Sequence, residues 1–250
     1  MRNMKKMISV SDRSGRMALT RRGFLAAGGA AAAAGLAGCA SSTTQRFTAE
    51  TAPTAFYDDP GPDLPPGDTS YAEVYGSMTD DGYVIPAVPY HQIDPQFWRQ
   101  IVEDPTGEDP GTIVVDPNEK LLYHVHGDGT ATRYGVGVGR AGFGWSGRGQ
   151  IQAKKHWPTW TPPSEMIDRQ PELAKYSAKN GGMDPGLMNP LGARAMYIFQ
   201  DGHDTLYRVH GSPEWNSIGK AVSSGCIRMM NQDVIHLYSH VQVHSPILVV

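Results

Sequence analysis

Two residues in the C-terminal part of the chain have side chains that could work together in nucleophilic chemistry. His210 ends an alternating apolar segment and is followed by Gly211, and Cys226 lies sixteen residues further on. A thiolate is a strong nucleophile, but an unperturbed thiol has a pKa of about 8.5 and is mostly protonated at neutral pH. A neighbouring imidazole can take the thiol proton. We therefore interpret Cys226 as a candidate nucleophile and His210 as its candidate base.

The residues around Cys226 could supply what acyl transfer needs. Negative charge develops on the reacting carbonyl oxygen, and N–H donors must stabilise it. The small residues Ser223, Ser224 and Gly225 precede the thiol, and such a turn can aim successive amides at one point. Arg228 would share the face of Cys226 in an extended segment, where it could bind a substrate carboxylate. The alternative is a structural thiol and a core histidine that are neighbours only in sequence.

The N-terminal segment, residues 1–39, has the features of an export signal. Basic residues precede the pair Arg21-Arg22, and an apolar run rich in Ala and Gly ends at Cys39. The run is shorter than the roughly 20 residues of a membrane-spanning helix, which favours a removed signal. The arginine pair resembles a twin-arginine export signal. Residues 36–39, Leu-Ala-Gly-Cys, resemble the bacterial lipoprotein box, in which the cysteine is lipidated; the alternative is cleavage nearby at an Ala-rich site.

Lipidation of Cys39 would leave Cys226 as the free thiol of the exported protein, because the sequence has only two cysteines. A thiol in an oxidising compartment risks oxidation and mispairing, so chemistry is the usual reason to keep one. We expect a periplasmic protein with an N-terminal lipid anchor in a membrane. Ala40 does not resemble an inner-membrane retention signal, which favours the outer membrane.

Composition predicts one turn-rich, mainly β domain with additional segments. The 250 residues include 29 Gly and 19 Pro, and only 19% are charged. The formal net charge of −3 is too mild to favour a nucleic-acid partner. We expect residues 40–70, rich in Ser, Thr, Pro and Gly, to be a flexible linker. Residues 71–109 are expected to form an extension that packs on the main domain, residues 110–250.

Alternating or β-branched segments bounded by turn residues predict a series of strands. They cover residues 82–86, 112–116, 121–126, 132–138, 150–155, 195–199, 205–210 and 243–250. Short helices are expected at 95–102, opened by Asp94 as N-cap, and at 232–239. Strands at this spacing favour a β-sandwich or a barrel.

The stretch from His210-Gly211 through Ile218-Gly219 to residues 223–229, Ser-Ser-Gly-Cys-Ile-Arg-Met, resembles the signature of the L,D-transpeptidases, the YkuD-type catalytic domain. The resemblance covers about residues 110–250 and includes the run from Asn189 to Ala195. It departs from the commoner pattern at Ser224, where many members carry His. If that residue acts through its backbone, Ser can serve.

The resemblance implies a YkuD-like β-sandwich or barrel with short helices, and an active site in a cleft. Cys226 would attack the meso-diaminopimelate carbonyl of a peptidoglycan tetrapeptide stem and release D-alanine. An amine of a second stem would then accept the acyl group, giving a 3-3 cross-link. His210 would be the base, oriented by the carbonyl of Gly211.

The resemblance also implies the surroundings of the thiol and the partners. The amides of Ser224, Gly225 and Cys226 would bind the oxyanion, and Ser223 and Arg228 would support the site. No cofactor and no metal are expected. The expected partners are peptidoglycan stems, a wall-attached protein as a second acceptor, and a membrane through the lipid anchor, and the protein would be a monomer.

Other reactions at the same site stay open. Water as the acceptor would make the protein an L,D-carboxypeptidase, and a protein acceptor would make it a ligase or hydrolase of protein-to-wall links. A non-catalytic peptidoglycan-binding protein is the alternative from another class. The joint presence of His210, Gly225, Cys226 and Arg228 argues against it, because a binder would not need the thiol.

Further motifs have weaker functional interpretations. His124 and His126 could be half of a metal site, but a solvated strand face is favoured. Asp80-Asp81 is expected to be a solvated turn, and His236 and His240 surface or helix residues. The glycines 135, 137 and 139 predict close strand packing rather than a phosphate loop. Residues 140–190 exceed what a minimal domain needs, and we interpret them as a flap over the donor cleft, with a packed surface loop as the alternative.

Overall fold

The computed structural model describes residues 70–140 and 144–250. The predicted export signal, Cys39 and the linker up to residue 69 therefore lie outside the described residues. Among the residues that are described, no helix is long and apolar enough to cross a membrane.

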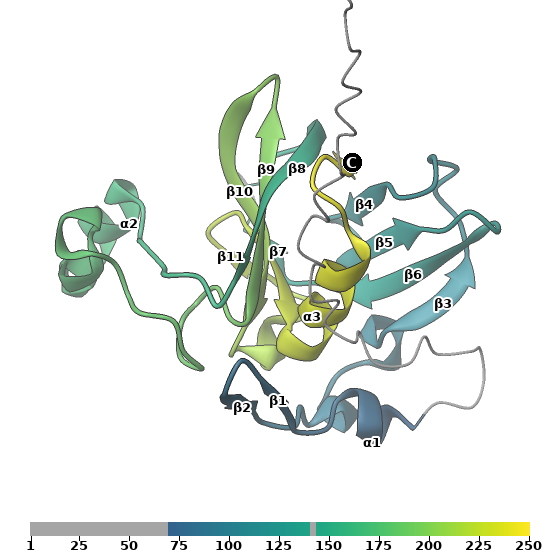
Figure 1. The fold of residues 1–250 in the computed structure, drawn as a ribbon, viewed down its shortest axis with the longest axis horizontal. Coiled ribbons are helices and arrows are strands. Elements are labelled where there is room, and N and C mark those ends of the chain that lie inside the picture. The colour runs from purple at the N-terminus through teal and green to yellow at the C-terminus, as the bar shows by residue number, and fades with distance from the viewer. Residues whose placement is uncertain (1–69, 141–143) are drawn as a thin grey trace, which may run out of the picture. The chain divides into compact units, whose positions relative to one another are not determined.

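A nine-stranded mixed sheet organises these residues, in the order β12-β10-β9-β8-β13-β4-β5-β6-β3 (Figure 1). Its strands are β3 (Gln100–Glu103), β4 (Ile113–Asp116), β5 (Leu121–Val125), β6 (Thr130–Gly135), β8 (Gly147–His156), β9 (Arg194–Gln200), β10 (His203–Ser212), β12 (Ile227–Met230) and β13 (Pro246–Val249). Two pairs are parallel, β4 with β13 and β10 with β12, and the others are antiparallel.

A short bridge joins β12, at one end of this strand order, to the chain that follows β6. The segment after β6 forms β7 (Val138–Gly139), which pairs with β11 (Ala221–Ser223). Just before β7, the Gly137 amide donates to the Arg228 carbonyl at 2.9 Å, and the Arg228 amide donates back at 2.8 Å. Since Arg228 lies in β12, the sheet curls until its first strand meets the chain that leaves β6. The expected mainly β sandwich or barrel is confirmed.

The core lies inside this curled sheet and under α3 (Asn231–His240). Apolar residues of the strands and of α3 form one buried cluster, including Ile151, Met196, Val209 and Leu237. Burial of each such side chain stabilises the fold by roughly 1.5 to 3 kcal/mol. The helix packs against β9, β10 and β12. Two of these strands, β10 and β12, carry the candidate residues His210 and Arg228.

The predicted strands of the main domain are confirmed within a few residues, but the helix expected at 95–102 is wrong. Asp94 caps a 3-10 helix, Pro95–Phe97, by accepting a hydrogen bond from the Gln96 amide at 3.1 Å. The chain then becomes β3, because residues from Gln100 onward pair with β6. Pairing with an open sheet edge outweighs the continuation of one helical turn.

The glycines 135 and 137 pack closely, as expected. A side chain at Gly135 would clash with Phe97, and one at Gly137 would clash with the carbonyl of Ser217. These two positions let the N-terminal extension and a later loop approach the backbone of the sheet.

The extension before β3 is tied to the sheet by a buried ion pair. It contains α1 (Tyr71–Val74) and the hairpin β1 (Met78–Asp80) and β2 (Tyr83–Ile85). Both terminal guanidinium nitrogens of Arg194 donate to Asp80 at 2.7 Å, and the Trp157 indole donates to the same carboxylate at 2.7 Å. The Arg194 side chain is fully buried. The expectation of a solvated turn at Asp80 is therefore wrong; only Asp81 is largely exposed there.

The solvated strand face expected at His124 and His126 needs correction, whereas His236 and His240 lie in helix α3, one of the two places expected for them. His124 is buried, so it does not lie on a solvated face, while the half-buried His126 hydrogen-bonds the hydroxyls of Thr130 and Thr132 at 2.9 Å. His236 is buried within α3 and contacts the Tyr134 hydroxyl at 2.8 Å. Burial lowers the pKa of His124 to about 4 and that of His236 well below its ordinary value. Among the described residues, no cluster of three or more His, Cys, Asp or Glu side chains could hold a metal ion.

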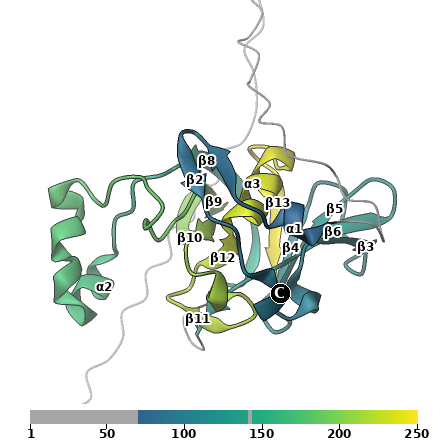
Figure 2. The same cartoon turned by 90° about the horizontal axis from the view of Figure 1, so that it is seen from below.

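Residues 157–193 form an arm that leaves the sheet after β8 and returns into β9. It contains α2 (Ser164–Arg169) and two 3-10 helices, Pro171–Tyr176 and Ala178–Asn180. Figures 1 and 2 both draw α2 to one side of the sheet. The arm is closed at its base by Asn189, whose amide donates to the carbonyls of Pro158, Met183 and Asp184.

Replacement of Asp80 by Asn should strongly destabilise the protein, because Arg194 would keep its charge without a buried counterion. We expect the free energy of unfolding to fall by about 3 to 5 kcal/mol in a urea titration. Asp81→Asn is the matched control, since this carboxylate is exposed and lies 4.0 Å from Arg194; it should cost less than about 1 kcal/mol. Equal losses in the two variants would contradict the assignment.

Candidate active site

The parallel pairing of β10 with β12 places the sequence-predicted residues side by side. His210 of β10 is in register with Arg228 of β12, and Cys226 immediately precedes β12. Partners in a ladder project to the same face of a sheet, and so do residues two apart in one strand. His210, Cys226 and Arg228 therefore meet at one end of this strand pair, although sixteen residues separate the histidine from the thiol.

The His210 ring is buried and oriented by the next residue. Its Nδ1 atom lies 2.6 Å from the carbonyl oxygen of Gly211, so Nδ1–H donates there and Nε2 is left as the basic nitrogen. Burial, together with the smaller effect of the charges of Arg228 and Arg208, lowers the pKa of His210 to about 4, although the carbonyls of Gly211 and Pro190 oppose the shift. The imidazole is neutral at pH 7, as a base must be.

The Cys226 thiol is half-buried at the turn between β11 and β12. Its Sγ atom lies 4.0 Å from the carbonyl oxygen of Leu206. Burial raises the pKa of the thiol, whereas the Arg208 amide and the charges of Arg208 and Arg228 act in the opposite direction. Within residues 70–140 and 144–250, no hydrogen bond joins the thiol to His210. The resting site thus holds a neutral thiol and a neutral imidazole rather than an ion pair.

The turn before the thiol is braced by Ser223. Its hydroxyl donates to the Cys226 carbonyl at 2.7 Å and accepts from the Gly225 amide at 3.1 Å. Gly225 has a φ of 128°, a conformation that favours glycine. Because the Gly225 amide is already engaged, the amides of Ser224 and Cys226 are the better placed donors for an oxyanion; neither has an acceptor among the described residues. Ser224 itself is exposed.

Arg228 is held by an acidic residue that the sequence analysis did not single out. Its Nη1 atom lies 2.5 Å from Oε2 of Glu214, in the loop between β10 and β11. The pair fixes a positive charge two residues beyond the thiol. A substrate carboxylate could reach this guanidinium only by sharing it with Glu214.

Other residues that sequence reasoning missed belong to a β-bulge in β10. The pairing of β10 with β9 shifts between Asp204 and Arg208, and these two side chains form a double hydrogen bond at 2.6 and 2.7 Å. Leu206 lies within the bulge with a φ of 65°, and its side chain is 73% exposed. The bulge turns the Leu206 carbonyl toward the thiol. No periodicity in the sequence indicates it, because the strand pattern continues unbroken through residues 205–210.

The end of the arm lies against the buried histidine. The carbonyl of Pro190 points toward the His210 ring. A side chain at Gly192 would clash with the backbone of Gly211, so the two segments are in close contact. The Ala193 amide donates to Asn231 of α3 at 3.0 Å. The run from residue 189 to 195 therefore packs against His210 and the backbone of Gly211, and so helps to hold the imidazole in position.

Several known proteins are similar to this chain in sequence. Residues 110–249 match the family profile of the YkuD L,D-transpeptidase catalytic domain. The chain is 30% identical over 141 residues to the probable L,D-transpeptidase YbiS of Escherichia coli, covering 53% of this chain and 42% of that protein. It is 32% identical over 148 residues to the probable L,D-transpeptidase ErfK/SrfK of E. coli, covering 55% and 43%.

The matched part thus spans less than half the length of these curated relatives. Among solved structures, a probable carnitine operon oxidoreductase from Brucella melitensis is 46% identical, covers 62% of this chain and 94% of its own, and superposes with a TM-score of 0.44.

The raised pKa of the thiol predicts slow alkylation of Cys226 at neutral pH. Iodoacetamide reacts with the thiolate, so its rate should rise with pH through a midpoint above about 8.5, the value of an ordinary thiol. Arg228→Gln should move the midpoint upward, because it removes a charge that lowers the thiol pKa. Peptide mass spectrometry would follow Cys226 separately from Cys39. A plateau reached below pH 7 would show a preformed thiolate and contradict this prediction.

Proposed function

Because the chain belongs to the L,D-transpeptidase family, we propose that it is a peptidoglycan L,D-transpeptidase with Cys226 as nucleophile. The observation that carries the proposal is the β10–β12 register, which brings a buried, carbonyl-oriented imidazole to the strand end that bears the thiol. A structural cysteine and a core histidine would need neither this orientation nor the braced turn at Ser223.

The acylation step follows from the neutral pair. As Sγ of Cys226 attacks the meso-diaminopimelate carbonyl of a tetrapeptide stem, its proton passes to Nε2 of His210. The carbonyl oxygen takes the negative charge, and the amides of Ser224 and Cys226 stabilise it. When the bond to D-alanine breaks, the leaving amine takes the proton from His210. The enzyme is left as a thioester with a neutral imidazole.

Deacylation reverses these proton movements. The amine of a second stem attacks the thioester carbonyl and gives up a proton to His210. The tetrahedral intermediate then releases Sγ, which recovers its proton from the imidazole. The product is a 3-3 cross-link, and the thiol and imidazole are again neutral. Burial suits this cycle, because it disfavours the charged imidazolium except while the oxyanion is present.

The other residues have supporting roles in this proposal. The Gly211 carbonyl holds His210 in one tautomer, and Ser223 braces the turn. Arg228 supports the site from its pair with Glu214. Ser224 contributes its amide rather than its side chain, so its difference from the commoner His is tolerated. The arm, residues 157–193, acts as a flap at the donor side, because its end at Pro190 faces His210.

The location and the wider organisation of the chain are also proposed. Residues 1–39 would export the protein to the periplasm, Cys39 would carry the lipid anchor, and residues 40–70 would be the tether. Residues 71–109 would then form the extension of a catalytic domain over residues 110–250. The packing of Tyr75 and Ile93 with Ile218 and Met230 supports that extension.

A carbapenem presents an activated carbonyl and should acylate the protein once, at Cys226. Intact-protein mass spectrometry is expected to show one adduct in the wild type and none in Cys226→Ala. His210→Gln should slow adduct formation by about a hundredfold or more, because the proton acceptor is lost. The absence of any adduct in the folded wild type would count heavily against a catalytic thiol.

Incubation with a disaccharide-tetrapeptide should identify the acceptor. We expect dimers joined by a 3-3 link together with free D-alanine, as measured by chromatography and mass spectrometry. Formation of tripeptide without dimer would instead indicate an L,D-carboxypeptidase. Consumption of the disaccharide-tetrapeptide only when a protein acceptor is added would indicate a ligase. Binding without any turnover would favour a non-catalytic peptidoglycan-binding protein. Cys226→Ala is the control for each product.

A further inference from the structure

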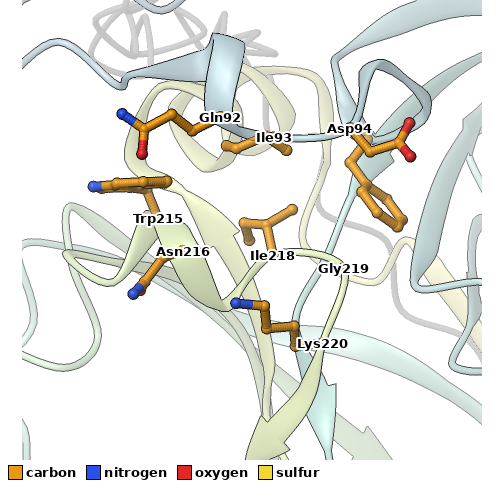
Figure 3. Close-up of a pocket in the computed structure, with 9 residues that line it drawn as sticks. Gln92, Ile93, Asp94, Trp215, Asn216, Ile218, Gly219 and Lys220 are labelled. Atoms are coloured by element: carbon orange, nitrogen blue, oxygen red, sulfur yellow. The ribbon is translucent and has the colours of Figure 1, made fainter.

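A cavity of about 480 Å³ lies beside the candidate site and has no part in the chemistry described above. One wall comes from the N-terminal extension and the other from the loop between β10 and β11, as Figure 3 shows. The lining residues are Gln92, Ile93, Asp94, Phe97, Trp215, Asn216, Ile218, Gly219 and Lys220. A volume of this size accommodates a small-molecule ligand.

The cavity combines an aromatic face with neutral hydrogen-bonding groups. Figure 3 places the Trp215 ring between the side chains of Gln92 and Asn216, with Ile218 toward the centre. In the part of the chain that the structure describes, the two amide side chains make no hydrogen bond. Each offers one acceptor and two donors to a ligand.

The charged groups of the lining balance each other. Asp94 and Lys220 contribute one charge of each sign. Asp94 accepts from the Gln96 amide through Oδ1, which leaves Oδ2 available. Such a lining has no net preference for an anion or a cation. It favours a neutral ligand with an apolar face and many hydroxyl and amide groups, which is the chemistry of an N-acetylated sugar.

The cavity wall is built by close backbone contacts. Gly219 has a φ of 78°, and a side chain there would clash with the Phe97 ring. The Gly219 amide donates to the Val136 carbonyl at 3.0 Å, and the Val138 amide donates to the Lys220 carbonyl at 3.0 Å. The loop is thus fixed to the sheet on one side and to the extension on the other, so the cavity exists before any ligand arrives.

The same loop leads directly to the thiol. Lys220 precedes Cys226 by six residues, which span at most about 20 Å when fully extended. Glu214, at the start of the loop, is paired with Arg228. The loop that lines the cavity is therefore joined to both sides of the thiol, through Glu214 to Arg228 and through residues 221–225 to Cys226, so one extended substrate could contact the cavity and the site.

We propose that this cavity binds the N-acetylated glycan to which the stem peptide is attached. Trp215 stacks on the apolar face of one sugar ring, and Gln92 and Asn216 hydrogen-bond its hydroxyl and acetamido groups. The choice of this ligand rests on the proposed function, because the proposed substrate is peptidoglycan. It assigns the N-terminal extension a role in substrate recognition, because Gln92 and Asp94 belong to it.

Binding of peptide-free glycan tests the cavity without any turnover. The purified full chain is titrated with soluble chains of alternating N-acetylglucosamine and N-acetylmuramic acid, followed by isothermal calorimetry. The double variant Gln92→Ala/Asn216→Ala should bind about tenfold more weakly, as the loss of two neutral hydrogen bonds predicts. The matched control Gln96→Ala/Asn118→Ala changes exposed residues of the same types outside the cavity and should bind like the wild type.

A second variant tests the stacking separately. Trp215→Leu keeps apolar volume in the packed cluster but removes the ring, and it should weaken glycan binding while the thermal midpoint of unfolding stays close to the control. Failure of the wild type to bind glycan, or equal binding by the cavity and control variants, would overturn the proposal.

Kinetic measurements with two substrates, one with and one without the sugar, test the glycan site separately from the proposed catalytic function. The cavity variant should raise KM for disaccharide-tetrapeptide and leave turnover of the sugar-free tetrapeptide unchanged. Equal effects on both substrates would exclude a glycan subsite. If the wild type turns over neither substrate and forms no carbapenem adduct, the proposed function fails, and the binding titration alone decides whether the cavity takes glycan.

Discussion

The β12 strand is held along both edges, and the candidate site depends on this constraint. On one edge it pairs in parallel with β10, which carries His210, and on the other Arg228 exchanges two hydrogen bonds with Gly137. A parallel pair cannot be joined by a tight hairpin, so the chain must make a longer excursion between the two strands. That excursion supplies the Glu214 loop, one wall of the cavity and the braced turn that presents Cys226.

Burial determines the electrostatic state of the site more than its charged neighbours do. Two arginines near Cys226 favour the thiolate, yet desolvation raises the pKa of the thiol and lowers that of His210. Both effects favour the uncharged forms, so in the proposed reaction proton transfer accompanies attack on the carbonyl. The same balance favours the protonated thiol, which is less reactive toward oxidants than the thiolate.

Much of this arrangement was accessible from sequence, for identifiable reasons. Alternation locates the strands because each has a buried face, and residue types alone single out His210 and Cys226, which the parallel strands β10 and β12 bring together. Long-range partners were not accessible. Nothing local distinguishes Asp80 from a solvated turn residue until Arg194 is placed against it. The burial of His124 and His236 likewise depends on residues about a hundred positions away, because His124 lies against His240 and His236 against Tyr134.

The ion pair between Asp80 and Arg194 has a consequence for modularity. The family match begins at residue 110, but Arg194, which lies inside it, takes its counterion from residue 80. Cutting the chain at the start of the matched segment would remove the carboxylate that neutralises this buried guanidinium. The extension and the matched segment are therefore coupled in folding, and the boundary drawn by sequence similarity is not a boundary of folding.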